Sequence, residues 1–224
     1  MSRTRFSVLA FFTLISLTIS SKVNVGVEVM PQFSSRVSWT AGVKLEIPIV
    51  DKLYFSTGVA YSSRHRYNQS LLETTEFHPE GNVISSYEKA SIDVKGNYIN
   101  IPLLVGYKSY VGSTYTIKLA GGIYYAYGVS GKSKLKMDDN GDISQMFLPS
   151  FKTAIGHRSD YGLCIDANCL LYSHYYIGLN LQHGLRKIYE AIEMQGINDP
   201  FLFHRLGPGV RFHQSIGLSI GYLF

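Results

Sequence analysis

The last ten residues constrain the fold of this chain more than any other stretch. Large apolar residues alternate there with small ones: the large ones are Ile216, Leu218, Ile220, Tyr222 and Phe224, and the small ones are Ser215, Gly217, Ser219 and Gly221. Side chains on a β-strand point to opposite faces with a period of two. The segment therefore predicts a strand with one apolar face and one nearly bare face. An open, fully apolar strand edge invites aggregation in water, so the pattern is typical of a strand between lipid and a narrow barrel interior.

The same alternation recurs along the chain. It is found over residues 22–31, 36–48, 53–63, 97–108, 115–130, 160–171 and 175–185, and again over 210–224. No position on the apolar faces carries Asp, Glu, Lys or Arg. A charge that faces lipid near the bilayer midplane costs about 2–4 kcal/mol. A soluble sandwich would also have one polar and one apolar face per strand, but the connection lengths and the N-terminal segment favour a membrane protein. We therefore predict an all-β fold, an eight-stranded antiparallel up-and-down transmembrane β-barrel.

Charged residues occur on the opposite faces of these strands. We predict that they form a polar network in the lumen, composed of Glu28, Lys44, Glu46, Lys118, Asp166 and Arg211. Eight strands leave an interior that side chains fill, and an unpaired buried charge costs several kcal/mol. These residues are therefore expected to pair and plug the barrel; a narrow gated conduit is the alternative.

The connections between the predicted strands alternate in length. Residues 50–52, 109–114 and 172–174 form short connections, and residues 64–96, 131–159 and 186–209 form long ones; 32–35 is short where a long one is expected. Outer-membrane barrels have short periplasmic turns and longer external loops, so both termini should be periplasmic. The loop 186–209 carries Phe201, Leu202 and Phe203, which either fold back on the barrel rim or bind a protein partner.

Residues 1–20 are expected to be a signal peptide, and 21–224 a single outer-membrane β-barrel domain. Arg3 and Arg5 precede a short apolar segment that ends on the small residues Thr18 and Ser20, which is the layout of a secretory signal. Its apolar part is shorter than the ~20 residues of a spanning helix. At the other end, Tyr222 and Phe224 are expected to be the signal that the barrel-assembly machinery reads.

The composition and motifs argue against other classes of function. The formal net charge of +5 includes Arg3 and Arg5 and is too small to indicate nucleic-acid binding. Polar residues that could catalyse a reaction are His65, His157, Ser159, Asp160, His204 and His213, but no catalytic motif contains them. The acidic segment 138–142 begins like a calcium loop but has Pro149 where a bidentate Glu is needed. Cys164 and Cys169 are expected to be free thiols. No enzyme activity, cofactor or metal is predicted.

Aromatic residues gather near the predicted strand ends and predict two girdles at the membrane interfaces. The periplasmic girdle would contain Tyr54, Phe55, Tyr107, Tyr110, Tyr115, Tyr172, Tyr175, Tyr176, Tyr222 and Phe224, and the outer one Trp39, Tyr61, Tyr67, Tyr125, Tyr127, Tyr161 and Phe212. Within the fourth strand, Pro102 predicts an adjacent β-bulge, because proline cannot donate a ladder hydrogen bond.

Residues 97–108, which read NYINIPLLVGYK, resemble the fourth strand of PorT-like outer-membrane β-barrel proteins, and residues 178–188 are similar to their penultimate strand. The resemblance implies a barrel in the bacterial outer membrane without enzymatic activity. The named member of that family takes part in a protein secretion and gliding apparatus. We expect a scaffold that contacts outer-membrane lipid and binds a protein partner through its external loops. A narrow transport barrel for small solutes, and a surface hydrolase or lipid-modifying enzyme, are the alternatives.

Overall fold

The computed structural model describes residues 23–77, 82–112, 114–137, 145–149, 158–187, 192–195, 202–206 and 212–224. Its strands are β1 (Asn24–Phe33), β2 (Val37–Val50), β3 (Leu53–Phe77), β4 (Val83–Val111), β5 (Tyr115–Met137), β6 (Gln145–Pro149), β7 (Ser159–Leu171), β8 (Tyr175–Lys187), β9 (Ile192–Gln195), β10 (Leu202–Leu206) and β11 (Phe212–Leu223). In these parts of the chain, no helix is long and apolar enough to cross a membrane. The expected signal peptide lies outside the described residues.

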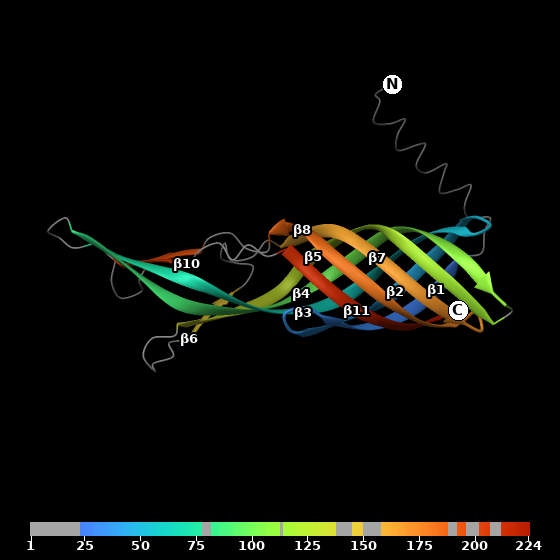
Figure 1. The fold of residues 1–224 in the computed structure, drawn as a ribbon, viewed down its shortest axis with the longest axis horizontal. Coiled ribbons are helices and arrows are strands. Elements are labelled where there is room, and N and C mark those ends of the chain that lie inside the picture. The colour runs from blue at the N-terminus through green and yellow to red at the C-terminus, as the bar shows by residue number, and fades with distance from the viewer. Residues whose placement is uncertain are drawn as a thin grey trace, which may run out of the picture.

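Eight of the strands close into a barrel (Figure 1). Each of β1, β2, β3, β4, β5, β7, β8 and β11 is antiparallel to its neighbours. The first and last strands close the ring, with Gly26 opposite Leu223 and Phe33 opposite Ile216. The predicted eight-stranded antiparallel barrel is therefore confirmed.

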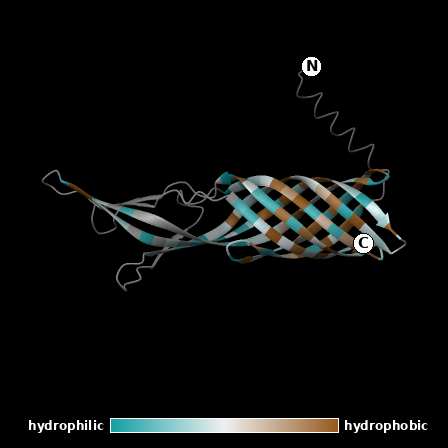
Figure 2. Cartoon of the chain, viewed as in Figure 1, coloured by the Kyte–Doolittle hydropathy of each residue, from teal (hydrophilic) through white to brown (hydrophobic). Residues whose placement is uncertain are grey.

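Hydrophobic and hydrophilic residues alternate along the strands of the barrel (Figure 2), so the two faces of its wall differ in polarity. Apolar side chains cover the outside, where Val29 is 56%, Leu119 58% and Ile220 54% exposed. Charged side chains lie inside, where Lys44 and Asp166 are buried. Such an outer surface would be unfavourable in water. Burying an apolar side chain away from water stabilises a protein by about 1.5–3 kcal/mol, and these side chains would lose that contribution. Lipid is the solvent that this barrel requires.

Three strands continue beyond one end of the barrel and form an open sheet. Strand β3 stays paired with β4 as far as Phe77 and Val83, and β10 and β9 add to β3 while β6 adds to β5. The resulting strand order is β6-β5-β4-β3-β10-β9, which extends away from the barrel in Figure 1. The prediction that residues 64–96 form a loop is wrong: most of them lie in two long strands. The long connection between the third and fourth predicted strands is thus a hairpin of β3 with β4.

The bulge that was predicted beside Pro102 lies elsewhere. The β4–β5 register shifts between Asn97 and Tyr98. At Pro102 itself, the β3–β4 ladder is interrupted between two pairs, Thr57 with Leu103 and Ala60 with Asn100. The register is the same on both sides of the interruption, so no bulge is present there. Proline has no N–H to donate, so the ladder loses pairs there without gaining a residue.

The short connections lie at the end of the barrel opposite the open sheet. They join β2 to β3, β4 to β5 and β7 to β8. The described residues with positive φ are Asp51, Gly112, Tyr172 and Ser173, and all of them lie in these turns. Tight hairpin turns require such backbone conformations. The predicted short connections are thus confirmed as turns.

Candidate functional site: the lumen of the barrel

A network of ion pairs crosses the middle of the lumen. The Lys44 ammonium of β2 lies 2.7 Å from Asp166 Oδ2 of β7 and 3.9 Å from Glu46 Oε1. The Lys118 ammonium of β5 donates to Glu46 Oε2 at 2.5 Å. These side chains lie on opposite walls of the barrel, so the pairs tie β2 to β5 and β7 through the interior. An unpaired buried charge would cost several kcal/mol, and each of these four groups has an opposite partner.

Uncharged groups extend this network toward β1, β8 and β11. Asn168 donates to Asp166 Oδ2 at 2.8 Å, and Ser219 donates to Asn168 Oδ1 at 3.0 Å. The Tyr176 hydroxyl donates to Glu28 Oε2 at 3.1 Å. The structure thus joins Lys44, Glu46, Lys118 and Asp166 in one network. Glu28 is linked to it through Tyr176, whose ring centre lies 5.2 Å from the Lys44 ammonium. Arg211 lies outside the described residues.

A second ionic cluster lies nearer the open sheet and was not predicted. Arg64 of β3 donates to Asp160 Oδ2 of β7 at 2.7 Å, and the Tyr124 hydroxyl donates to the same oxygen at 2.9 Å. The guanidinium carbon lies 4.7 Å from the Tyr98 ring centre and 5.5 Å from that of Tyr124, within cation–π range. The predicted third strand ends at residue 63, which leaves Arg64 in a predicted loop. Continued alternation would have put Arg64 on the inner face.

Two tyrosines that were predicted to belong to the periplasmic girdle point into the lumen instead. Tyr54 is 3% and Tyr176 4% exposed. Their neighbours Phe55 and Tyr175 face outward, so strict alternation puts both rings inside. Glycines face these rings: a Cβ on Gly106 would collide with the Tyr54 ring, and one on Gly221 with the Tyr176 ring. Gly221, one of the small residues that alternate along the last strand, therefore leaves space for an inward aromatic ring.

The outward aromatic residues gather at both ends of the barrel. At the short-turn end, the ring of Tyr222 lies 5.0 Å from that of Tyr175 and 5.2 Å from that of Phe224. At the other end, the Trp39 and Tyr61 rings lie 5.5 Å apart. The predicted assembly-signal residues Tyr222 and Phe224 thus belong to one aromatic cluster, and the Phe224 N–H donates to the Val25 carbonyl of β1 at 2.8 Å.

The polar residues weighed as catalytic groups are distributed over several places. Asp160 belongs to the second ionic cluster, and His213 packs edge-on to Tyr124 with ring centres 6.3 Å apart. Ser159 accepts a hydrogen bond from Arg186 Nη1, and His65 contacts Asp93. Of the others, His204 lies in β10 and His157 outside the described residues. The described residues that were considered thus form no single cluster.

The described cysteines are free, as predicted: Cys164 is buried in the lumen and Cys169 is partly exposed. Among the described residues, no group of three or more His, Cys, Asp or Glu side chains is placed to hold a metal ion. The segment 138–142 lies outside the described residues.

The residues of the expected partner loop do not lie in a free loop. Leu202 and Phe203 belong to β10, where they pair with Glu76 and Thr75 of β3, and Phe201 lies outside the described residues. The prediction of a free loop is therefore wrong for residues 202 and 203, because β10 is paired on one side with β3 and on the other with β9.

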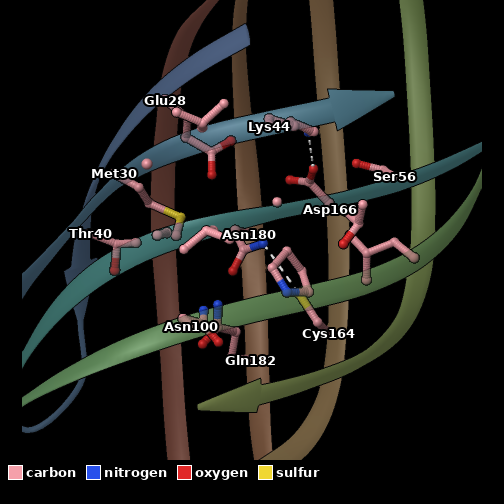
Figure 3. A pocket seen from close by; sticks show the side chains of 18 residues that line it. Glu28, Met30, Thr40, Lys44, Ser56, Asn100, Cys164, Asp166, Asn180 and Gln182 are labelled. Carbon is pink, nitrogen blue, oxygen red and sulfur yellow. Dashed lines mark hydrogen bonds and ion pairs between the residues drawn. The ribbon is translucent and has the colours of Figure 1, made fainter. Parts of the chain in front are cut away.

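A small cavity adjoins the central network (Figure 3). Its volume is about 30 Å³. Its lining includes Glu28, Met30, Thr40, Lys44, Ser56, Asn100, Cys164, Asp166, Asn180 and Gln182. A cavity needs roughly 10–15 Å³ to hold one water molecule, so this space has room for about two.

Comparisons with solved structures find outer-membrane barrels. The N-terminal β-barrel domain of Pseudomonas aeruginosa OprF matches with a TM-score of 0.38 and 12% identity, covering 90% of this chain and 97% of that one. Ail, the attachment invasion locus protein of Yersinia pestis, matches with a TM-score of 0.36 and 12% identity, covering 91% and 97%. Neisserial surface protein A matches with a TM-score of 0.34 and 9% identity, covering 90% and 96%. A comparison with curated proteins finds no match.

The model of the outer membrane protein beta-barrel domain family matches residues 5–190. That range includes β1 to β8 and hence most of the barrel wall described above. The apolar outer surface and the closed antiparallel sheet agree with this match. The chain belongs to the outer membrane protein beta-barrel domain family and resides in the bacterial outer membrane.

Proposed function

We propose that this protein is a non-enzymatic scaffold of the outer membrane that binds a protein partner on the open sheet beyond the barrel. The observation that carries the proposal is the pair of exposed sheet edges. Within the described residues, β6 pairs with β5 alone and β9 with β10 alone. Each edge strand therefore presents backbone donors and acceptors on one side, which is the arrangement that an extended segment of another protein can join.

The position of the sheet supports this reading. It continues from the end of the barrel opposite the short turns, and barrels of this class place their short turns in the periplasm and their longer connections outside. The proposed partner is thus an extracellular or surface-bound protein. The resemblance of residues 97–108 to PorT-like proteins supports a finer form of the proposal, in which the partner belongs to a protein secretion apparatus.

The test compares the native protein with a variant that lacks one edge. Replacing residues 188–209 by a two-residue Asn-Gly turn removes β9 and β10. Both proteins carry the same affinity tag and are cross-linked in intact cells of the native host, purified and analysed by mass spectrometry. We expect a discrete partner with the native protein and its loss from the variant. Heat-modifiable gel mobility should show that both barrels are folded.

A second variant provides the matched control for the other edge. Replacing residues 138–157 by the same turn removes β6 and leaves β9 and β10. Loss of the partner from this variant alone would move the proposed site to β6. An unchanged partner with both deletions combined would place binding on the barrel and overturn the proposal.

The two alternative functions have less support. A transport barrel needs a path through the lumen, yet Lys44–Asp166 and Arg64–Asp160 pairs cross it at two levels. A hydrolase needs an accessible nucleophile beside a base, yet Ser215 and His213, whose Oγ and Nε2 atoms lie 3.3 Å apart, are both buried.

A further inference from the structure

A row of basic residues lies on the outward face of the barrel, where its strands continue into the open sheet. Lys95 of β4 is directly opposite Lys132 of β5 on one side and His65 of β3 on the other. Residues that are opposite each other on neighbouring strands lie on the same face. This face is the outward one, because Gly96, the next residue after Lys95, is buried and faces the inward Tyr98 ring. Both lysines are exposed.

The strand registers place this row relative to the membrane. Tyr61 of β3 and Tyr127 of β5 are both opposite Ile99 of β4, and both rings are exposed on the outside of the barrel. Outward aromatic rings of this kind lie at the level of the lipid headgroups. Lys95 lies four residues beyond Ile99, which is about 13 Å along the strand and about 10 Å along the membrane normal for a tilt of about 40°. A lysine can extend its long stem along the wall, so its ammonium can reach the headgroups.

The turn between β1 and β2 lies at the same level as the basic row. Ser34 Oγ donates to the His65 carbonyl oxygen at 3.3 Å, and the Tyr67 N–H donates to Ser35 Oγ at 3.0 Å. From the same turn, Arg36 Nη2 lies 3.8 Å from Asp93 Oδ2. The row therefore belongs to the rim of the barrel, beside the lipid-facing wall, and not to the far end of the open sheet.

The rim carries more positive charge than its own carboxylates neutralise. Its described cationic side chains that face outward or lie in exposed turns are Arg36, Lys95, Lys132, Lys134 and Arg158. Among the described side chains of this outward face, the one carboxylate is Asp93, which is opposite Lys134 and contacts Arg36 and His65. Lys95 and Lys132 have no ion-pair partner among the described residues. Like charges directly opposite on neighbouring strands are destabilising, so this pair favours a bound anion.

We propose that this rim binds the phosphate groups of anionic lipids in the adjacent membrane leaflet, with Lys95 and Lys132 holding one phosphate between them. Cβ atoms of directly opposite residues lie about 4.5–5.5 Å apart, so both ammonium groups can donate to oxygens of the same phosphate. The wall below the pair is apolar and contacts acyl chains, so a phosphorylated lipid meets both surfaces and a soluble anion meets only one. Such contacts would fix the depth of the barrel in the membrane. The proposal is independent of any protein partner.

The direct test measures the binding of lipid A, a glycolipid with phosphate monoester groups, to the full chain folded in detergent micelles. Native mass spectrometry at increasing lipid concentration gives the affinity. The reference ligand is the same glycolipid after enzymatic removal of its phosphates, which keeps the acyl chains unchanged. We expect the phosphorylated lipid to bind at least about tenfold more tightly, because charge-assisted hydrogen bonds to phosphate are strong. Equal affinity for the two lipids would overturn the proposal.

Competition with soluble anions separates a lipid from other anionic ligands. Glycerol phosphate and poly-glutamate, each at the concentration of the bound lipid, should leave most of the lipid A in place because neither contacts the apolar wall. Displacement by glycerol phosphate at that concentration would indicate a site for soluble phosphates. Displacement by poly-glutamate would indicate a site for an acidic protein. Either displacement would overturn the assignment to lipid.

Two double variants of equal net charge separate the site from general electrostatic attraction. Lys95→Gln combined with Lys132→Gln should weaken lipid A binding at least about tenfold and leave binding of the dephosphorylated lipid unchanged. The matched control is Lys52→Gln combined with Lys89→Gln, which removes two exposed lysines from the β2–β3 turn and from the part of β4 farther from the barrel. Its affinity should equal that of the native protein. Heat-modifiable gel mobility should show that both variants are folded. Native-like affinity of the first variant, or equal losses in both, would refute the site.

Discussion

The inward tyrosines Tyr54 and Tyr176 illustrate how single residues decide the packing of a narrow barrel. Each ring fills the lumen opposite a glycine of a nearby strand, Gly106 for the first and Gly221 for the second. The barrel thus uses missing side chains on one strand to hold large rings from another. Protein interiors tolerate few voids and few overlaps, so these glycines are structural requirements of the interior.

Gly221→Ala should destabilise the barrel by about 1–3 kcal/mol, which is the usual cost of overpacking. The new methyl group would meet both the Tyr176 ring and the Val27 carbonyl oxygen, and the backbone atom cannot move aside cheaply. Urea unfolding in lipid vesicles, followed by the fluorescence of the single tryptophan, Trp39, measures the change.

Gly121→Ala is the control for this prediction. Gly121 faces outward, and its added Cβ would lie 4.0 Å from the nearest atom considered, the Cys164 carbonyl oxygen. Its effect should stay within about 0.5 kcal/mol. Equal losses of stability in the two variants would contradict the pairing of Gly221 with the Tyr176 ring.

The lumen shows what alternation predicts for individual residues and what it does not. Alternation alone placed Glu28, Lys44, Glu46, Lys118 and Asp166 on inner faces. Alternation also puts Tyr54 and Tyr176 on inner faces, whereas their position near strand ends predicts a girdle. The choice of ionic partners could not be predicted, because it depends on the stagger between strands that are distant in sequence.

At the scale of the element, β11 separates two environments across one strand. Leu218 lies on the outer face opposite Leu179 of β8, and Ser219 lies on the inner face, fully buried. Its outer side chains meet lipid and its inner ones meet the polar network. The last strand therefore has its large apolar side chains on the outer face and its small side chains on the inner face, as the sequence predicts.

Leu218→Arg should reduce insertion into vesicles, with a cost of about 2–4 kcal/mol near the bilayer midplane. The guanidinium would replace an apolar side chain in contact with lipid. The folded fraction is measured by heat-modifiable gel mobility after refolding into vesicles. Gln214→Arg is the matched control, since Gln214 is exposed near the outer end of the same strand, where the expected cost is about 0–1 kcal/mol. Native-like insertion of Leu218→Arg would refute the assigned lipid face.

The elements that were predicted correctly are those in contact with lipid. Their alternation is clear because lipid excludes charge from one face. The extensions of β3 and β4 were missed because water surrounds both faces there, as the sequence around Glu73 and Glu76 shows. Polar residues then occupy both faces, and the period of two no longer appears in the sequence.

At the scale of the whole molecule, the barrel and the open sheet share β3, β4 and β5. The barrel encloses a lumen, and the sheet does not. The barrel has a lumen crossed by buried ion pairs, whereas the sheet is open at β6 and β9 among the described strands. The membrane-embedded part thus has ion pairs across its lumen, and the part beyond it has exposed strand edges among the described strands.

The native protein should give no steady conductance steps in planar lipid bilayers. The Lys44–Asp166 and Lys118–Glu46 pairs span the lumen, and the adjoining cavity is only about 30 Å³. A wide porin in the same bilayer serves as the positive control. Reproducible unitary steps from the native protein would favour the transport barrel instead.

The ion pairs of the lumen also bear on how the chain reaches its folded state. Lys44 and Asp166 are separated by 122 residues, Arg64 and Asp160 by 96, and Lys118 and Glu46 by 72. Hairpins can form between neighbouring strands without bringing any of these partners together. The pairs can form only when the sheet has curled on itself. They therefore stabilise the closed barrel and not the pairing of neighbouring strands. Contacts of such high sequence separation make folding slow, and we expect all three pairs to form together with the closure of the ring between β1 and β11.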